Sequence, residues 1–247
     1  MELERTQDPA QIFQGHVKNA GNKFQSSGLP QPQVEDKSMS KIFWHLGDTN
    51  PDYRSIMREH KDFEVDGRLI PALQTVIAEQ THSNLVHICS LQDNGAGFND
   101  HPQIPVADAL VSNIPNQFLL IRTADCTPVL LYDEHRGVIA AAHSGREGTR
   151  KNIVGACVNA MVQHFGCDPS ELVAHVGAGI CEKHYEVSES IFEVFNQSLT
   201  KQDFCPCTNQ FRHLNIRTTI FQQLIRAGLR FFNIENIDIC TYEDPGY

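Results

Sequence analysis

Short apolar runs separated by turn residues fill the middle of the chain and predict β-strands. Glycine, asparagine and proline punctuate these runs, as in Asp93-Asn94-Gly95 and Pro115-Asn116. Because the spacings are short, they favour hairpins and mixed or antiparallel pairing over repeated crossover helices. The predicted strands lie over residues 73–78, 85–89, 107–111, 118–122, 129–132 and 138–142.

Helical periodicity appears on both sides of this β-rich region. Apolar residues recur every three to four positions from Ile153 to Phe165, and Gly166 ends the pattern. The other predicted elements are helices over 188–198 and 215–227, a helix that begins around Pro51, and strands over 171–176 and 237–241.

Residues 1–40 differ in composition from the rest of the chain. They are polar and rich in Gln, Asn, Gly, Ser and Pro, which is typical of loops. Residues 41–247 carry no internal repeat, no heptads and no low-complexity linker. We therefore predict a polar N-terminal extension, part of it mobile, followed by a single α+β domain over 41–247.

The charge of the chain limits the kinds of partner that we expect, and its cysteines indicate a redox compartment. Lys and Arg number 20 against 30 Asp and Glu, a net charge of −10, which argues against nucleic acid and anionic membranes. No run reaches the roughly 18 apolar residues of a membrane span. The eight cysteines are widely spaced and no apolar leader follows Met1, so we expect reduced thiols and a cytoplasmic protein. The sequence does not predict an oligomeric state.

Three candidate metal ligands lie at the ends of predicted strands or between them. Cys126 follows the 118–122 run, His143 ends the 138–142 run, and His82 lies in a polar break. Three protein ligands would leave one tetrahedral position open, which is typical of a catalytic zinc. The neighbouring Asp125 would disfavour a free thiolate unless a cation offset it, which favours metal binding over a free cysteine nucleophile.

Other candidate ligands fit a metal site less well. His87 reads as a mid-strand residue, and Cys205 and Cys207 lie one residue apart, without the C-x2-C spacing of structural zinc. We therefore interpret the Cys205–Cys207 segment as a loop.

The segment after His143 has the features of an anion site. Ser144 and Gly145 form a turn directly before a predicted helix, where free backbone N–H groups favour phosphate. Arg146 adds charge and a planar fork of donors. We therefore name Ser144, Gly145 and Arg146 as candidate substrate-binding residues, together with Arg122 at the end of the 118–122 run.

Together these motifs resemble a family variously called multicopper polyphenol oxidoreductase (laccase), peptidoglycan editing factor or purine nucleoside phosphorylase. The resemblance runs from about residue 42 to 244. The matching segments are Gln80-Thr81-His82, Asp108-Ala109-Leu110-Val111-Ser112, Thr123-Ala124-Asp125-Cys126-Thr127-Pro128, Ala141-Ala142-His143-Ser144-Gly145 and Gly177-Ala178-Gly179-Ile180, followed by Tyr185-Glu186-Val187.

The resemblance implies a fold and an activity. The fold is a single layered α/β/β/α domain with mixed sheets, and a zinc ion would be bound by His82, Cys126 and His143. Members of the family are reported to cleave purine nucleosides, including methylthioadenosine, with phosphate and to deaminate adenosine. Our leading hypothesis is therefore a zinc-dependent enzyme for adenosine, inosine or methylthioadenosine. Asp125, Cys126 and His143 would form its catalytic centre, with Asp125 as proton carrier and Arg146 near phosphate.

This chain departs from the family pattern at the phosphate turn. The family usually has a tryptophan and a base where Arg146 and Glu147 stand here. Glu147 would repel phosphate unless Arg146 replaced the missing base. Farther along, Lys183 and His184 occupy positions where cysteines are common.

Three other functions stay open. A copper-dependent polyphenol oxidase agrees with the older family name, but blue-copper sites usually add an axial methionine and no methionine lies in a matching segment. A cysteine hydrolase would use Cys126 as nucleophile and His143 as base. An editing factor for cell-wall precursors would act through a partner.

Overall fold

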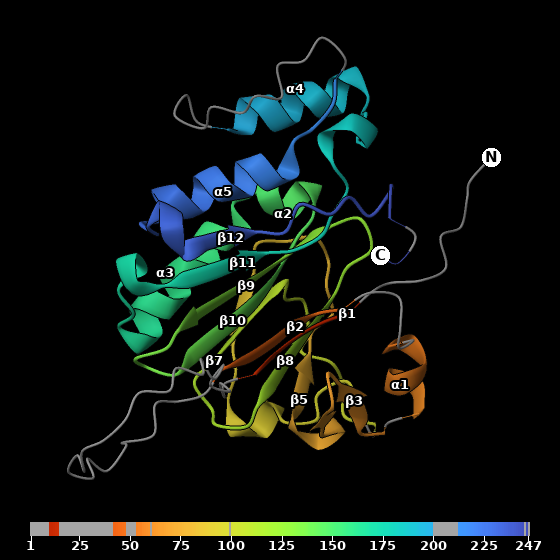
Figure 1. Ribbon diagram of the computed structural model, residues 1–247, viewed down its shortest axis with the longest axis vertical. Helices are drawn as coiled ribbons and strands as arrows, with labels where there is room; N and C mark the ends of the chain where they lie inside the picture. The colour runs from red at the N-terminus through yellow and green to blue at the C-terminus, as the bar shows by residue number, and fades with distance from the viewer. Residues whose placement is uncertain are drawn as a thin grey trace, which may run out of the picture.

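Two mixed β-sheets lie face to face at the centre of the computed structural model (Figure 1). The structure describes residues 10–14, 42–47, 53–59, 61–98, 100–199, 212–244 and 246. Helices cover the outer face of the larger sheet, and a hairpin and a short helix cover the smaller one. The predicted α+β class with α/β/β/α layers is confirmed.

The larger sheet has six strands in the order β12-β11-β9-β10-β7-β6. Neighbours around β9 and β10 run antiparallel, whereas β6 pairs parallel with β7 and β12 pairs parallel with β11. The mixed pairing predicted from the short spacings is therefore confirmed. The strands are β6 (Val86–Ile88), β7 (Ala109–Ser112), β9 (Thr127–Asp133), β10 (Val138–Ser144), β11 (Val173–Val176) and β12 (Ile234–Asn236).

The smaller sheet has four strands in the order β2-β1-β8-β5. They are β1 (Ala10–Gln14), β2 (Phe43–Leu46), β5 (Thr75–Ile77) and β8 (Phe118–Arg122). Its outer face packs against the hairpin of β3 (Phe63–Val65) and β4 (Arg68–Ile70), and against α1 (Tyr53–Glu59). Asp66 and Gly67 form the hairpin turn with φ of 50° and 72°, the left-handed conformation that two-residue hairpin loops favour.

Strands apolar on both faces produce this layering, because successive side chains point to opposite sides of a sheet. In β10, Ala140 and Ala142 belong to the core beneath the helices, whereas Ile139 and Ala141 belong to the core between the sheets. Continuing the alternation, His143 lies on the face that meets the smaller sheet.

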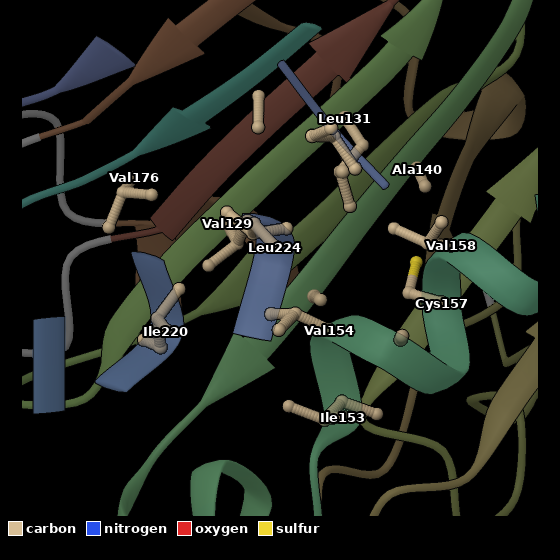
Figure 2. Close-up of a cluster of buried hydrophobic side chains, with 14 of the residues drawn as sticks. Val129, Leu131, Ala140, Ile153, Val154, Cys157, Val158, Val176, Ile220 and Leu224 are labelled. Carbon is tan, nitrogen blue, oxygen red and sulfur yellow. The ribbon is translucent and has the colours of Figure 1, made fainter. Parts of the chain in front are cut away.

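The core beneath the helices is formed by α3 (Ile153–Phe165) and α5 (Ile216–Arg226) against the larger sheet. Helix α3 has the predicted bounds and ends at Gly166, whose φ is 67°. The helices α2 (Arg146–Arg150) and α4 (Glu189–Ser198) flank this pair. Figure 2 shows side chains of this core, with labels on Val129, Leu131, Ala140, Ile153, Val154, Cys157, Val158, Val176, Ile220 and Leu224.

An aromatic stack joins the two sheets. Trp44 of β2 stacks on His175 of β11, with ring centroids 4.1 Å apart. The His175 ring lies 5.8 Å from the ring of Tyr132 in β9. The smaller sheet is therefore fixed to the larger one by ring contacts as well as by aliphatic packing.

The predicted strand over 237–241 is wrong. The strand lies earlier, at β12, and pairs with β11 as far as Asn236. Beyond it the N–H of Ile239 donates to the carbonyl of Ile237, a tight turn that ends the extended backbone. The alternating residues Ile237, Ile239 and Thr241 therefore belong to an irregular segment.

Other predictions concern the chain outside this core. Five residues of the predicted polar extension form β1, and the rest of residues 1–40 lie outside the described residues, as do Cys205 and Cys207. In the part of the chain that the structure describes, no helix is both long and apolar enough to span a membrane.

Candidate metal and active site

Three chain segments converge at one end of the paired sheets. The connection from β5 to β6 carries His82, and the connection from β8 to β9 carries Cys126. Both connections cross from the smaller sheet to the larger one. His143 joins them near the end of β10, where it pairs in register with Pro128 of β9. A site at this position therefore follows from the strand connections themselves.

The structure brings the three predicted ligands together. One ligand atom from each of His82, Cys126 and His143 lies within 4.8 Å of the other two. His82 Nε2 is 3.9 Å from Cys126 Sγ, and the two imidazole rings meet edge to face at 4.8 Å between centroids. Tetrahedral zinc with typical bond lengths separates N and S ligands by about 3.6 Å. The donor spacing thus suits one metal ion.

Asp108, just before β7, organises this group. Its buried carboxylate accepts hydrogen bonds from the backbone N–H groups of Thr81 (3.1 Å), His82 (2.9 Å) and Ser83 (2.7 Å). It also accepts the Ser83 hydroxyl at 2.6 Å and lies 2.9 Å from His143 Nδ1. One carboxylate therefore shapes the turn that carries the first histidine and orients the ring of the second.

The hydrogen bond to Asp108 determines which ring nitrogen of His143 can bind a metal. Because the Asp108 carboxylate accepts a hydrogen bond from Nδ1, Nδ1 carries the proton of the neutral ring, and Nε2 is the nitrogen that a metal would bind in place of a proton. Burial opposes ionisation of both partners, but the bond outweighs it. The pKa of Asp108 therefore lies well below its usual range, and the pKa of His143 rises to about 9 through Asp108 and Cys126.

The thiol of Cys126 is prepared for ionisation. Burial would raise its pKa, but hydrogen bonds with His143 and His82 lower the pKa to about 7. The same contact with Cys126 raises the pKa of His82. A thiolate is the form that binds metals and attacks electrophiles, so the geometry serves either chemistry.

Position 145 requires glycine because there is no space for a larger side chain. A Cβ atom there would lie 2.6 Å from Cys126 Sγ and 3.1 Å from His82 Cδ2. Its φ of −77° is open to any residue, so close approach is the reason for glycine. The backbone at this position therefore closes one side of the metal-ligand group.

The predicted anion turn has a different form from the one expected. Ser144 belongs to β10 and is buried, with its hydroxyl 2.8 Å from that of Thr149. The helix that follows Gly145, α2, has only five residues, so its dipole is shorter than the prediction assumed. Ser144 holds α2 to the end of β10, and its role in binding substrate stays a prediction.

Charged side chains of α2, and that of Lys151 which follows it, come soon after His143 in the chain. Glu147 pairs with Arg150 at 2.9 Å and contacts Arg146 at 3.5 Å. Lys151 directs its ammonium to the carbonyl of His82 at 3.5 Å. Three cations therefore accompany one carboxylate, and the negative charge of Glu147 is already paired.

Two further predicted residues have structural partners. The backbone N–H of Arg122 donates to Gln80 Oε1 at 2.8 Å, and its guanidinium reaches Gln103 at 3.4 Å. Asp125 accepts a hydrogen bond from the hydroxyl of Thr241 at 2.8 Å. Their roles in substrate binding and proton transfer stay predictions.

Sequence reasoning missed two residues of the site. Asp108 is the first, and Tyr185 is the second. Burial raises the pKa of Tyr185, while a hydrogen bond and the charge of Arg146 oppose that rise, which places the phenol beside Arg146. Both residues lie in segments that carry the family resemblance, and that was the available signal.

Comparisons with known proteins find relatives of this chain. The family model of the multi-copper polyphenol oxidoreductase laccases matches residues 44–247. A protein of Bacteroides thetaiotaomicron named purine nucleoside phosphorylase is 31% identical over 178 residues, which cover 68% of this chain and 64% of that protein. This chain thus spans less than two thirds of that relative's length.

Other relatives are similar over longer or different stretches. The purine nucleoside phosphorylase YlmD of Bacillus subtilis is 28% identical over 245 residues, covering 97% of this chain and 85% of the relative. Adenosine deaminase RL5, from an unknown prokaryotic organism, is 28% identical over 189 residues, covering 72% and 71%. The crystal structure of the Bacillus licheniformis protein YfiH superimposes with a TM-score of 0.63 at 28% identity, covering 69% and 65%.

Proposed function

The chain belongs to the family of multi-copper polyphenol oxidoreductase laccases, and on that premise we propose that it is a zinc-dependent enzyme acting on purine nucleosides. The observation that carries the proposal is the group of His82, Cys126 and His143, with the ammonium of Lys151 at the end of α2 lying 3.5 Å from the carbonyl of His82. Relatives named purine nucleoside phosphorylase and adenosine deaminase support the substrate class.

Zinc suits the donor set. One thiolate and two imidazoles are ligands that zinc favours, and Asp108 behind His143 is the outer partner that such histidines usually have. When bound there, the ion would supply Lewis acidity at its open fourth position. Gly145 leaves room for the ligands but holds the site closed on one side.

Copper is less well supported. A blue-copper centre usually adds a long axial bond from methionine. Met161 is fully buried in α3 within the core beneath the helices, and so lies away from the ligand group. Among the described residues, each group of potential metal ligands contains a single imidazole pair or fewer, which is short of a multicopper cluster.

The charges of α2 support a phosphate co-substrate. Arg146, Arg150 and Lys151 carry three positive charges, and Glu147 is paired with both arginines. Arg146 therefore replaces the base that the family has at the next position, and the carboxylate acts as a brace for the guanidinium groups. An arginine fork binds phosphate oxygens with defined geometry.

Phosphorolysis is the reaction that we favour. An oxygen of phosphate, oriented by Arg146, would attack the anomeric carbon of the ribose. The bond from that carbon to the purine nitrogen would break, and its electron pair would leave with the base. Asp125, which adjoins Cys126, would carry the proton that the departing base takes up.

Deamination of adenosine is the second candidate. Water would attack C6 of adenosine, and the bond from C6 to the amino nitrogen would break. Asp125, half-buried beside the ligand group, would carry a proton from the water to the departing ammonia. One relative is named adenosine deaminase.

The six cysteines of the described residues are free thiols, which fits a reducing compartment such as the cytoplasm.

The decisive experiment is chromatography of adenosine, inosine and methylthioadenosine after incubation with zinc-replete protein, with and without phosphate. Phosphorolysis gives free base only with phosphate, and deamination gives inosine from adenosine without it. Either product should disappear in the Cys126→Ala variant. A zinc-replete protein that yields neither product would overturn the proposal.

Two arginine substitutions test whether phosphate binding depends on Arg146 itself or on positive charge in general. Arg146→Ala should raise the KM for phosphate about tenfold, which corresponds to the loss of about 1.4 kcal/mol of binding. Arg230→Ala is the matched control, because Arg230 pairs with Glu171 at 3.0 Å and does not belong to the charged residues of 146–151. Equal effects of the two substitutions would contradict a specific role for Arg146.

A further inference from the structure

A second group of soft ligands lies between two segments that are far apart in sequence. Cys181 directly precedes a short 3-10 turn after β11 and His184 is the last residue of that turn, whereas Cys240 comes from the segment after β12. One ligand atom of each lies within 4.8 Å of the others. None of these residues belongs to the site described above.

The distances within this group match those of a bound metal ion. His184 Nδ1 is 3.3 Å from Cys181 Sγ and 3.7 Å from Cys240 Sγ. Zinc in tetrahedral coordination separates its N and S ligands by about 3.6 Å. We propose that Cys181, His184 and Cys240 form a second zinc site, distinct from the one at Cys126.

Glu243 lies beside this group. Its Oε1 is 3.7 Å from His184 Nδ1, although the carboxylate lies outside the cluster that the other three ligand atoms form. Two thiolates and an imidazole supply three ligands, and this exposed carboxylate is the side chain that would turn to supply the fourth. A site with four protein ligands is structural, whereas the three-ligand group at Cys126 keeps an open position for chemistry.

The surroundings of the group also suit an ion. The backbone N–H of Cys181 donates to Cys240 Sγ at 3.2 Å, a bond that stabilises sulfur in the thiolate form. The ring of Tyr242 stacks on that of His184 at 4.4 Å and fixes its orientation. A pocket of about 350 Å³ reaches Cys181, Cys240 and Glu243, and gives the ion a path from solvent.

This ion would hold two residues of the first site in place. Thr241 follows Cys240 in the chain and donates to Asp125, the neighbour of Cys126. Tyr185 follows His184 and contacts Arg146. Both residues are joined covalently to ligands of the second ion, so binding there would order the wall of the first site.

The test is the zinc content of full-length protein, measured by mass spectrometry after removal of loosely bound metal. We expect two ions per chain in the wild type, one in Cys240→Ser and one in Cys126→Ser. Cys157→Ala is the matched control, because it removes a buried thiol of α3 remote from both groups and should keep two ions. One ion in the wild type that persists in Cys240→Ser would overturn the second site and leave the first intact.

Cobalt substitution keeps the proposal testable if Cys240→Ser fails to fold. Cobalt in the wild type should give thiolate charge-transfer absorption from three sulfurs, with Cys126→Ser retaining the part from two. Glu243→Gln should weaken metal retention while the absorption from thiolate persists. A Cys181–Cys240 disulfide in protein purified under reducing conditions, or loss of all cobalt absorption in Cys126→Ser, would contradict the proposal.

Discussion

At the scale of single residues, Asp108 connects the fold to the site. Its side chain is fully buried, which is costly for a charge unless hydrogen bonds replace water. Backbone and side-chain donors of residues 81–83, together with His143, supply those bonds. The ionised carboxylate is therefore stabilised by the same hydrogen bonds that position His82 and His143.

Replacing Asp108 with asparagine tests whether metal binding depends on the negative charge of this side chain as well as on its shape. The amide keeps the size but accepts fewer hydrogen bonds and no longer orients His143 as an anion does. We expect zinc affinity at the first site to fall by about 10–100-fold, measured by competition with a chromophoric chelator. Asp133→Asn is the control, because Asp133 is equally buried but pairs with Arg136 at the opposite end of β9. Unchanged affinity in Asp108→Asn would contradict the role of the carboxylate.

Gly145 permits a second test that depends on space alone. In Gly145→Ala the added Cβ would overlap Cys126 Sγ, since their distance would be 2.6 Å, so the sulfur must move. We expect loss of bound zinc from the first site, measured as metal content, with the far-ultraviolet circular dichroism unchanged.

Gly166→Ala is the matched control for this substitution. Gly166 has a φ of 67° and its Cβ would contact nothing within 4 Å, so the substitution costs about 1 kcal/mol of stability through backbone conformation. Its zinc content should remain that of the wild type. Retained zinc in Gly145→Ala would show that the site has more room than the structure gives it.

The sequence predicted the ligands but could not predict what orients them. Cys126 and His143 were identifiable because each lies next to a recognisable apolar run. The role of Asp108 depends on donors in a turn 25–27 residues earlier, and local pattern carries no information on such pairing. The left-handed φ of 59° at His82 likewise follows from that turn.

At the scale of elements, prediction succeeded where periodicity was long and unbroken. Helix α3 has the predicted bounds because its apolar stripe extends over more than three turns. The residues of the shorter α2 were predicted only as part of the turn before that helix. Asn152, with φ of 60°, separates α2 from α3 and caps the latter, and a single left-handed residue has no signal in apolar periodicity.

The turn after β6 gives an element-scale prediction about pH. Asp93 accepts hydrogen bonds from the backbone and hydroxyl of Ser90, at 2.7 and 2.9 Å, and lies 3.1 Å from His87 Nε2. Burial opposes ionisation, but these bonds hold the pKa of Asp93 below its ordinary value. The stabilisation is therefore present above the unfolded pKa of about 4 and is lost as pH falls through the folded pKa.

Asp93→Asn should consequently lower the free energy of unfolding by about 1 kcal/mol at neutral pH. Denaturant titrations at several pH values should show this difference shrinking below pH ~4, where the wild-type carboxylate also becomes neutral. The exposed Asp100 provides the control variant Asp100→Asn. A difference that stays constant through the acid range would contradict the assignment to ionised Asp93.

At the scale of the whole molecule, the stacking of the two sheets creates the site. The family resemblance implied a layered fold and the apolar runs predicted strands, but neither predicted which strands share a sheet. That partition sends two connections from one sheet to the other at the same end, with His82 on one and Cys126 on the other. The site therefore depends on correct stacking of both sheets.

The single tryptophan of the chain reports on this stacking. Trp44 lies on the smaller sheet and stacks on His175 of the larger one, so its fluorescence changes when the sheets separate. If residues 41–247 form one cooperative domain, fluorescence and far-ultraviolet circular dichroism should give the same midpoint and slope in urea. Trp44→Phe should keep the circular dichroism transition and remove the fluorescence signal, which establishes the source of that signal.

A fluorescence transition at lower urea would mean that the smaller sheet detaches first. Activity and zinc at the first site should then be lost with the fluorescence, because the ligand group forms only where the two sheets meet.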